Sequence, residues 1–533
     1  MTRRRTIALL LLLTAAAIAI QGYHPGLEDD AYYLAAIKRD LNPALFPHDA
    51  DFFRLQFQAT IYDKLIAASI RITHLPPDLT IFLWQLAVTL AILAVCLAIA
   101  RRCFQKPEAH WSATAAVAAL LTIPVSGTGI SLTDQYLHPR ALATAAILAA
   151  IVAILDNRYL RAALFLVAAA AVHVIMAAFG LSLCFFLSWR QLREDSRPRS
   201  GSSARAILAC WVCWLSSGAK LGRHAAILAS AALPLHWLFQ PTTEAWRAAA
   251  NTRHFNHLTA WPWYEWLGVI APFAILYYFA RQARIEADKR SQPESATRAR
   301  FSTALLYYAL FQFAVALIIL LPPQLERLRP FEPMRYLHLV YLLMFLIGGG
   351  LIGDHILGKN IYRWLLLFLP LSAGMFYAQR QMYPATAHLE FPGRAPSNDY
   401  LRAFQWIRGS TIINGQPRAN TPVDALFALD PYYMQQTGED FHGFRALAER
   451  SSLADMVKDP GMVARVPTLA EIWQSEVNAT KNWQNFQSSD FARLKTTFGV
   501  TWVVLAKSTA ASQAATDLIC PYQNQTVEVC RIE

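Results

Sequence analysis

Long apolar runs alternate with short charged segments over the first 378 residues of this 533-residue chain. A helix that spans a bilayer needs about 20 mostly apolar residues. Together with the hairpin described next, the runs predict an α-helical polytopic membrane domain over residues 1–378, with about ten membrane segments. The predicted crossings are 7–20, 81–100, 111–126, 140–155, 224–239, 264–280, 301–321, 337–353 and 361–378.

Residues 160–188 are also apolar, but one crossing there would place the five arginines within 190–205 outside the cytoplasm. Cytoplasmic loops normally carry the excess of Lys and Arg. We therefore expect two short helices that break near His173 and begin and end on the cytoplasmic side, followed by an interfacial segment at 206–217. His173 itself is expected to be a hydrogen-bonded interior residue rather than a ligand.

The first apolar run follows Arg3, Arg4 and Arg5 and is either a signal peptide or a retained helix. The positions of the later basic loops favour a retained helix with a cytoplasmic N-terminus. Residues 21–80 then form a long first outer loop, and the odd number of crossings places the C-terminus outside. The pattern predicts a multi-pass protein of a cell's inner or plasma membrane.

From residue 379 onward the long apolar runs end, and charged, Pro and Gly residues are evenly spread. Short apolar stretches at 425–429 and 500–505 indicate buried strands, whereas helices are indicated at 400–408, 443–457 and 468–477. Residues 379–533 are therefore predicted to form a separate soluble, extracytoplasmic α/β domain.

Composition supports the membrane assignment, because 55% of the residues are hydrophobic and only 16% are charged. Soluble domains usually contain about 25% charged residues. The net charge of +12 lies in the short loops before residue 379 and forms no basic patch typical of nucleic-acid binding. A purely soluble enzyme, a disordered scaffold, a coiled coil and a nucleic-acid partner are excluded.

The seven cysteines divide into two groups. Cys520 and Cys530 flank a short polar turn of the predicted outer domain, so we expect them to form a disulfide. The others lie in or beside cytoplasmic membrane segments and are expected to stay reduced. They are Cys96, Cys103, Cys184, Cys210 and Cys213.

Three adjacent carboxylates, Glu28, Asp29 and Asp30, follow the first predicted crossing. Like charges and partial desolvation raise carboxylate pKa values, and a carboxylate so tuned suits a general base acting on a hydroxyl or an amide. The alternative is structural, because Asp29 or Asp30 could cap the helix that follows.

Two further polar segments lie at the predicted outer edge of the membrane. One contains Asp134, His138 and Arg140, where a helix cap by Asp134 is an equal alternative. The other runs from 326 to 336, and its arginines are candidates to bind an anionic headgroup or to contact lipid. These arginines are Arg327, Arg329 and Arg335.

A metal site is a weaker hypothesis. His48, Asp49 and Asp51 fall within four positions, but without a second ligand cluster they favour a turn with a helix cap. The loop 240–263 adds Arg253, His254 and His257 to the predicted outer side. The sequence assigns no cofactor and leaves a divalent ion open.

The segment Asp29-Asp30-Ala31-Tyr32-Tyr33 resembles the Asp-Glu-Ala-x-Tyr segment of the GT-C superfamily, the polytopic glycosyltransferases that use lipid-linked phosphosugars. The long first outer loop and the soluble domain outside the membrane fit the same organisation. Segments at 406–408, 421–427 and 498–504 are similar to parts of the outer domain in such proteins. No Trp-Trp-Asp signature is present, which disfavours transfer to protein asparagine.

The resemblance implies inverting transfer of a sugar from a polyprenyl-phosphate carrier to an extracytoplasmic glycan, lipid or protein. Asp29 would be the base, with Asp30 or Glu28 orienting the acceptor. Arg335 and Arg140, near His138 and Asp134, would bind the phosphate. Rival hypotheses are a transporter or lipid flippase and a non-catalytic membrane scaffold, although few ionisable residues lie within the spans and no repeat of broken helices is visible.

Overall fold

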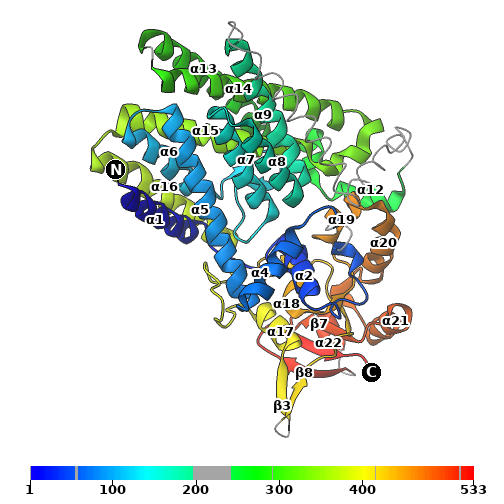
Figure 1. Cartoon of the computed structure of the whole chain (residues 1–533). Coiled ribbons are helices and arrows are strands. Elements are labelled where there is room, and N and C mark those ends of the chain that lie inside the picture. The colour runs from blue at the N-terminus through cyan, green and yellow to red at the C-terminus, as the bar shows by residue number, and fades with distance from the viewer. Residues whose placement is uncertain (1, 54–57, 196–241, 291, 414–415, 515–517) are drawn as a thin grey trace.

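A computed structural model describes residues 2–53, 58–195, 242–290, 292–413, 416–514 and 518–533. The predicted interfacial segment 206–217, the predicted crossing 224–239, and Cys210 and Cys213 lie outside these residues. The helices form a bundle at one side of the molecule, and the C-terminal strands and short helices lie at the other side (Figure 1).

Five described segments are long and apolar enough to cross a membrane. They are α1 (Arg3–Gln21), α5 (Pro77–Cys103), α14 (Pro293–Leu320), the segment Pro333–Leu357 around α15 (Leu337–Ile352), and α16 (Ile361–Met382). Three shorter apolar segments accompany them: α7 (Pro139–Leu155), α8 (Tyr159–Val172) and the part Val174–Trp189 of α9 (Val174–Asp195). These helices mark the chain as a membrane-embedded protein. The total of about ten segments stays a prediction.

Two predicted crossings differ in length from the described helices. The crossing at 264–280 is shorter than α13 (Trp263–Arg290), which contains it and extends to charged residues at both ends. The crossing at 111–126 is too long, because α6 (Pro107–Ala119) has 13 residues and is followed by the short strands β1 (Pro124–Val125) and β2 (Ile130–Ser131). Pro124 disfavours helical backbone at Ile123, so a continuous helix through residue 126 is not favoured.

The break predicted near His173 is confirmed, since α8 ends at Val172 and His173 has extended backbone angles. Its ring stacks 6.3 Å from that of His138, which precedes α7. His173 therefore lies beside the start of α7, and α9 packs back against both α7 and α8, as expected for a hairpin. The Nδ1 atom of His173 accepts a hydrogen bond from the Met176 N–H.

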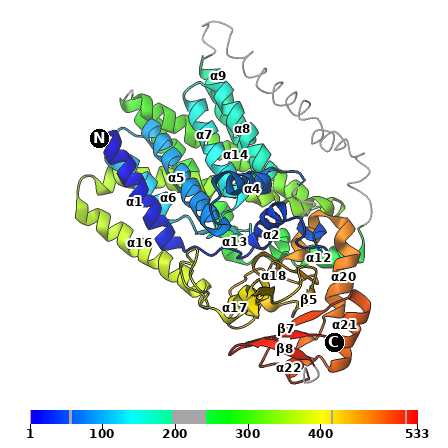
Figure 2. The ribbon, with the colours of Figure 1, turned by 60° about the horizontal axis from the view of Figure 1, so that its bottom comes forward.

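The basic loops meet at one end of the bundle. Arg101 contacts Thr6, Arg102 pairs with Asp156 at 2.6 Å, and Lys106 pairs with Asp354 at 2.8 Å. The other end of α1 leads to Tyr23, which pairs with Leu389 in a short β-bridge. The basic loops and the C-terminal strands therefore lie at opposite ends of the bundle (Figure 2).

The C-terminal region contains a five-stranded sheet in the order β6-β5-β7-β9-β8. Its strands are β5 (Leu426–Ala428), β6 (Ser451–Ser452), β7 (Trp502–Ala506), β8 (Ile519–Gln523) and β9 (Val527–Arg531). Strands β5, β6 and β7 are parallel, and β9 is antiparallel to both β7 and β8. The strands predicted at 425–429 and 500–505 are thus confirmed. A separate hairpin joins β3 (Ser410–Ile413) to β4 (Gln416–Ala419).

Helices pack around this sheet, and two of the three predicted ones are confirmed as α17 (Asp399–Arg408) and α20 (Ala470–Ala479). The helix predicted at 443–457 is wrong beyond Ala448, where α18 (Phe444–Ala448) ends because Glu449 takes left-handed backbone angles. The remaining helices are α19 (Asp459–Arg465), α21 (Ser488–Phe498) and α22 (Ala510–Ala514). The predicted disulfide between Cys520 and Cys530 is confirmed, and Cys96, Cys103 and Cys184 are buried.

The first long loop, 21–80, packs directly against the C-terminal region. It contains α2 (Asp30–Leu41) and α4 (Tyr62–Thr73), and Ala31 of α2 belongs to the same hydrophobic cluster as Phe404. Buried Arg445 pairs with Asp49 of the loop and, at 2.8 Å, with Asp459 of α19. These contacts fix α19 against the loop that carries the candidate base.

Candidate active site

A cavity of about 640 Å³ lies where the first long loop, the ends of the membrane helices and α19 meet. Acidic and basic side chains alternate around it. The acidic ones are Glu28, Asp29, Asp134, Glu265 and Glu332, and the basic ones are Arg140, Arg253, Arg335, Lys458 and Arg465. Concave sites with convergent polar groups are the usual places for ligands.

Most of the candidate residues from the sequence meet here. Glu28, Asp29, Asp134, Arg140 and Arg335 all line the cavity, although they come from three distant segments. His138 is buried directly behind Asp29, whereas the buried Asp30 does not line the cavity.

Asp29 directs its carboxylate at two neighbours. Its Oδ1 atom lies 3.2 Å from Lys458 Nζ, and its Oδ2 atom lies 4.0 Å from His138 Nε2. Asp29 occupies the cap position of α2, but its side chain makes no capping hydrogen bond. The capping alternative for Asp29 is therefore wrong. Its side chain is 35% exposed, so a ligand in the cavity can reach it.

The pKa of Asp29 is set by opposing effects. Burial raises it, but the positive charge of Lys458, helped by nearby arginines, outweighs burial and holds the pKa well below its usual value. The expectation of a raised pKa is thus wrong for Asp29, because the cation beside it comes from the distant C-terminal region. At neutral pH Asp29 is ionised and able to accept a proton.

Asp30 behaves differently from its neighbour. It is only 2% exposed, and its Oδ2 atom accepts a hydrogen bond from the Gly26 N–H at 2.6 Å. Burial raises the pKa of Asp30 to about 7. Asp30 therefore closes the turn before α2 and is not placed to contact a ligand in the cavity.

Lys458 contacts both Glu28 and Asp29. Glu28 also lines the cavity. Glu28 has left-handed backbone angles, which turn the chain so that both carboxylates approach the same cation. Glu28 is consequently placed to orient Lys458 or a bound hydroxyl.

The hydrogen bonds of His138 define where its proton lies. Its Nδ1 atom accepts from the Arg140 backbone N–H at 2.9 Å and so caps α7. The proton of a neutral ring therefore resides on Nε2, which faces Asp29 and has no hydrogen-bond partner among the described residues. Since His138 is the cap, the capping alternative for Asp134 is wrong.

Arg140 and Arg335 are buried arginines with unused donors. Arg140 Nη2 binds both oxygens of Asp134 at 2.6 Å, and Arg335 Nη1 pairs with Glu332 at 2.6 Å. Arg140 Nε and Nη1, and Arg335 Nε, have no partner among the described residues. Buried donors without acceptors are costly, and guanidinium groups bind phosphate oxygens well. Both arginines are suited to hold an anionic group.

Five charged lining residues were not identified from the sequence as site residues, namely Arg253, Glu265, Glu332, Lys458 and Arg465. Arg465 pairs with Glu332 at 3.1 Å, and Arg253 donates to the Lys458 carbonyl at 3.0 Å. Arg253 and Glu332 belong to the polar loops already noted, so their loops were a signal. Lys458 precedes α19 and Arg465 is its last residue, and nothing in their local sequence indicates the cavity.

Other candidates lie elsewhere. Arg327, Arg329, His254 and His257 do not line the cavity. Asp49 is engaged by Arg445, and His48 contacts the Asp424 carbonyl at 3.0 Å, so this pair serves the packing of the loop.

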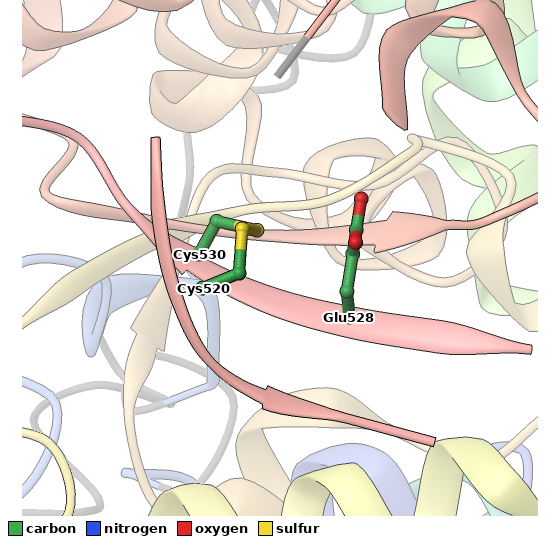
Figure 3. A group of neighbouring side chains, drawn as sticks. All are labelled: Cys520, Glu528 and Cys530. Carbon is green, nitrogen blue, oxygen red and sulfur yellow. A yellow bond between two sulfur atoms is a disulfide. The ribbon is translucent and has the colours of Figure 1, made fainter. Parts of the chain in front are cut away.

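One group within the described ranges has ligand atoms close enough for a metal ion, and it comprises Cys520, Glu528 and Cys530. Figure 3 shows the two sulfur atoms bonded to each other. Neither cysteine is therefore available as a thiolate ligand. Glu528 accepts a hydrogen bond from the Ser512 hydroxyl at 2.5 Å.

An apolar groove of about 250 Å³ lies between the apolar parts of α6, α13, α15 and α16. Ile275 and Phe279 of α13 and Leu367 and Leu371 of α16 form its sides, and α15 contributes Gly348. The cavity is lined by Glu265 of α13 and Met382 of α16. Ten residues separate Glu265 from Ile275, which is roughly 15 Å along a helix. The groove therefore lies deeper in the apolar bundle than the cavity and shares no lining residue with it.

No protein-family model matches the chain, and no curated protein is detectably similar to it in sequence. The likeness to the GT-C segment around Asp29 consequently remains an expectation from the sequence. The function is inferred from the cavity, its charges and the separate apolar groove on the same helices.

Proposed function

We propose that the protein transfers a sugar, with inversion, from a polyprenyl-phosphate carrier to an acceptor hydroxyl on the extracytoplasmic side of an inner or plasma membrane. One observation carries this proposal. A single cavity combines an ionised carboxylate with buried guanidinium donors that have no acceptor among the described residues, and a separate apolar groove lies between the same membrane helices, roughly 15 Å along α13.

The reaction would use Asp29 as the general base. The acceptor oxygen attacks the anomeric carbon from the face opposite the phosphate, the bond between that carbon and the phosphate oxygen breaks, and the phosphate leaves with the bonding electrons. Asp29 takes the proton of the acceptor hydroxyl. Lys458 keeps Asp29 ionised, and Glu28 is placed to orient the acceptor.

Arg140 and Arg335 would stabilise the leaving phosphate. The ion pairs with Asp134 and Glu332 fix the two guanidinium groups, whose unpaired donors are Nε and Nη1 of Arg140 and Nε of Arg335, so both positive charges are already in place when negative charge develops. His138, with its Nε2–H facing Asp29, would hold the carboxylate in place.

The apolar groove would hold the isoprenoid tail of the carrier. A lipid-linked substrate has a charged head that needs polar partners and a tail that favours an apolar surface, and the cavity and the groove supply these two environments. This match supports a lipid-linked donor over a soluble sugar nucleotide.

The direct test uses purified protein in vesicles that contain a labelled polyprenyl-phosphate sugar. Release of polyprenyl phosphate together with a glycosylated product supports the transferase. Movement of the intact labelled lipid across the bilayer without cleavage would instead establish a flippase. If neither cleavage nor movement is observed, the scaffold hypothesis remains.

The groove can be tested separately. A side chain added at Gly348 points toward Phe279, with the nearest ring carbon 3.4 Å from the new Cβ atom. Gly348→Leu should therefore fill the groove and raise the KM for a long-chain donor more than for a short-chain donor. Gly374→Leu on α16 is the matched control, because a Cβ there meets nothing within 4 Å. Equal kinetics for the two variants would contradict the assignment of the groove.

A further inference from the structure

We propose that the C-terminal region contains a second binding site, a cleft for neutral carbohydrate. The cleft has a volume of about 500 Å³ and lies between the segment after β5 and the end of α20. It shares no lining residue with the cavity that contains Asp29.

One part of the cleft is apolar and aromatic. Pro431, Met456 and Val477 line it together with the ring of Trp483, which is only 2% exposed. Tyr432 also lines the cleft and leaves 45% of its surface exposed. A sugar ring presents an apolar face of C–H groups, and an exposed aromatic ring is a flat partner for that face.

The rest of the lining consists mainly of side-chain amides, which can both donate to and accept from sugar hydroxyls. Gln436 and Gln484 each donate to Asp430 Oδ2 at 3.0 Å. This orients the two amides and leaves their Oε1 atoms without a partner among the described residues. Asn478 and Asn482 are exposed and also line the cleft.

The charge of the cleft favours a neutral ligand. Asp430 and Lys481 are its only charged lining residues, and Asp430 already accepts three hydrogen bonds. The lining contains no arginine comparable to those that face the Asp29 cavity. No β-strand contributes to it either, so an extended peptide has no strand edge to pair with. Carbohydrate fits these features better than phosphate or peptide.

The two sites share one loop. Met456 lines the cleft, whereas Lys458, two residues later, contacts Asp29 in the cavity. The Asp455 carboxylate accepts from the backbone N–H groups of both Val457 and Lys458 and so fixes this loop. A glycan bound in the cleft would therefore lie near the site of transfer, which assigns it the role of an acceptor. This role rests on the proposed function, whereas carbohydrate binding itself does not.

Isothermal titration calorimetry on the full-length, detergent-solubilised protein tests the proposal. The probes are four neutral oligosaccharides, namely cellotetraose, mannotetraose, xylotetraose and chitotetraose. We expect the wild-type protein to bind at least one of them, Tyr432→Ala to bind it about tenfold more weakly, and Tyr432→Phe to keep the affinity because the ring remains. Tyr377→Ala is the control, since Tyr377 lies on α16 and is 65% exposed.

Three results would overturn the proposal: no binding of any tetrasaccharide at ~10 mM, unchanged affinity in Tyr432→Ala, or equally tight binding of an uncharged tetrapeptide. The outcome also separates this inference from the proposed function. Oligosaccharide binding by a protein that never cleaves the lipid-linked donor would support the carbohydrate cleft and contradict the proposed transferase function. Sugar transfer without oligosaccharide binding would support the transferase function and contradict the carbohydrate cleft.

Discussion

The cationic side chains on the two walls of the cavity differ in how they are paired with carboxylates. On the wall formed by the membrane bundle, Arg140 and Arg335 each have an acidic partner and still keep buried donors unused. On the wall formed by α19, Lys458 is shared between Glu28 and Asp29, and Arg465 pairs with Glu332.

The difference lies in the partners rather than in burial, because Arg140 and Lys458 are both almost fully buried. A cation with spare donors can bind an added anion, whereas a cation committed to carboxylates mainly sets their ionisation. The bundle wall is thus suited to bind the donor phosphate, and the C-terminal wall is suited to tune the base. Changes on the two walls should have different consequences.

The largest effect is expected from the bundle wall. Arg140→Gln leaves Asp134 as an unpaired buried charge, which should lower the free energy of unfolding by about 3–5 kcal/mol and abolish turnover. Thermal unfolding and the donor-cleavage assay measure the two effects.

The double variant Arg140→Gln/Asp134→Asn separates them. Removing both charges should restore most of the stability but not the turnover, because the phosphate donors remain absent. Turnover near the wild-type rate in the double variant would show that Arg140 has only a structural role.

A smaller and different effect is expected on the C-terminal wall. Lys458→Met removes the largest influence that lowers the pKa of Asp29, so that pKa should rise. Because the ionised form is the base, the acidic limb of the pH–rate profile should move to higher pH by the same amount, with activity at high pH less affected. Lys458→Arg should keep the wild-type profile, and an unshifted profile in Lys458→Met would contradict the tuning role.

The smallest effect is expected for Asp30. Its pKa in the folded protein is about 7, above the usual 3.8, so the folded state holds a proton more tightly and loses stability as the pH rises from about 4 to about 7. Asp30→Asn should therefore be more stable than wild type at pH 8, by on the order of 1 kcal/mol, with little change in turnover. Melting temperatures measured at pH 5 and pH 8 check this, and a loss of stability at pH 8 would contradict it.

The sequence predicted the features that depend on local patterns. Apolar runs located α1, α5, α14, α15 and α16, and the excess arginines after residue 188 indicated the turn at His173. The segment around Asp29 indicated one side of the cavity because acidic groups at a membrane edge are unusual. The pair Cys520 and Cys530 was predictable from its short spacing in a polar hairpin.

The features that depend on distant contacts could not be predicted. Lys458 reverses the expected pKa shift of Asp29, although more than 400 residues separate the two in the chain. Asp29 and Asp30 have opposite pKa shifts because Asp30 is buried against the Gly26 N–H, whereas Asp29 faces Lys458. The local sequence does not indicate which of the two carboxylates is buried. The early end of α18 at Glu449 likewise reflects the packing that forms β6.

The most direct test of the account is the turnover of Asp29→Asn with labelled polyprenyl-phosphate sugar. Asparagine keeps the size of the side chain but cannot accept the proton, and Asp29 makes no capping hydrogen bond that the change could break. Folding and membrane level should therefore survive, also in Asp29→Ala, while the rate falls by about 100- to 10,000-fold. Sugar transfer by Asp29→Asn at close to the wild-type rate would contradict the assignment of Asp29 as the base.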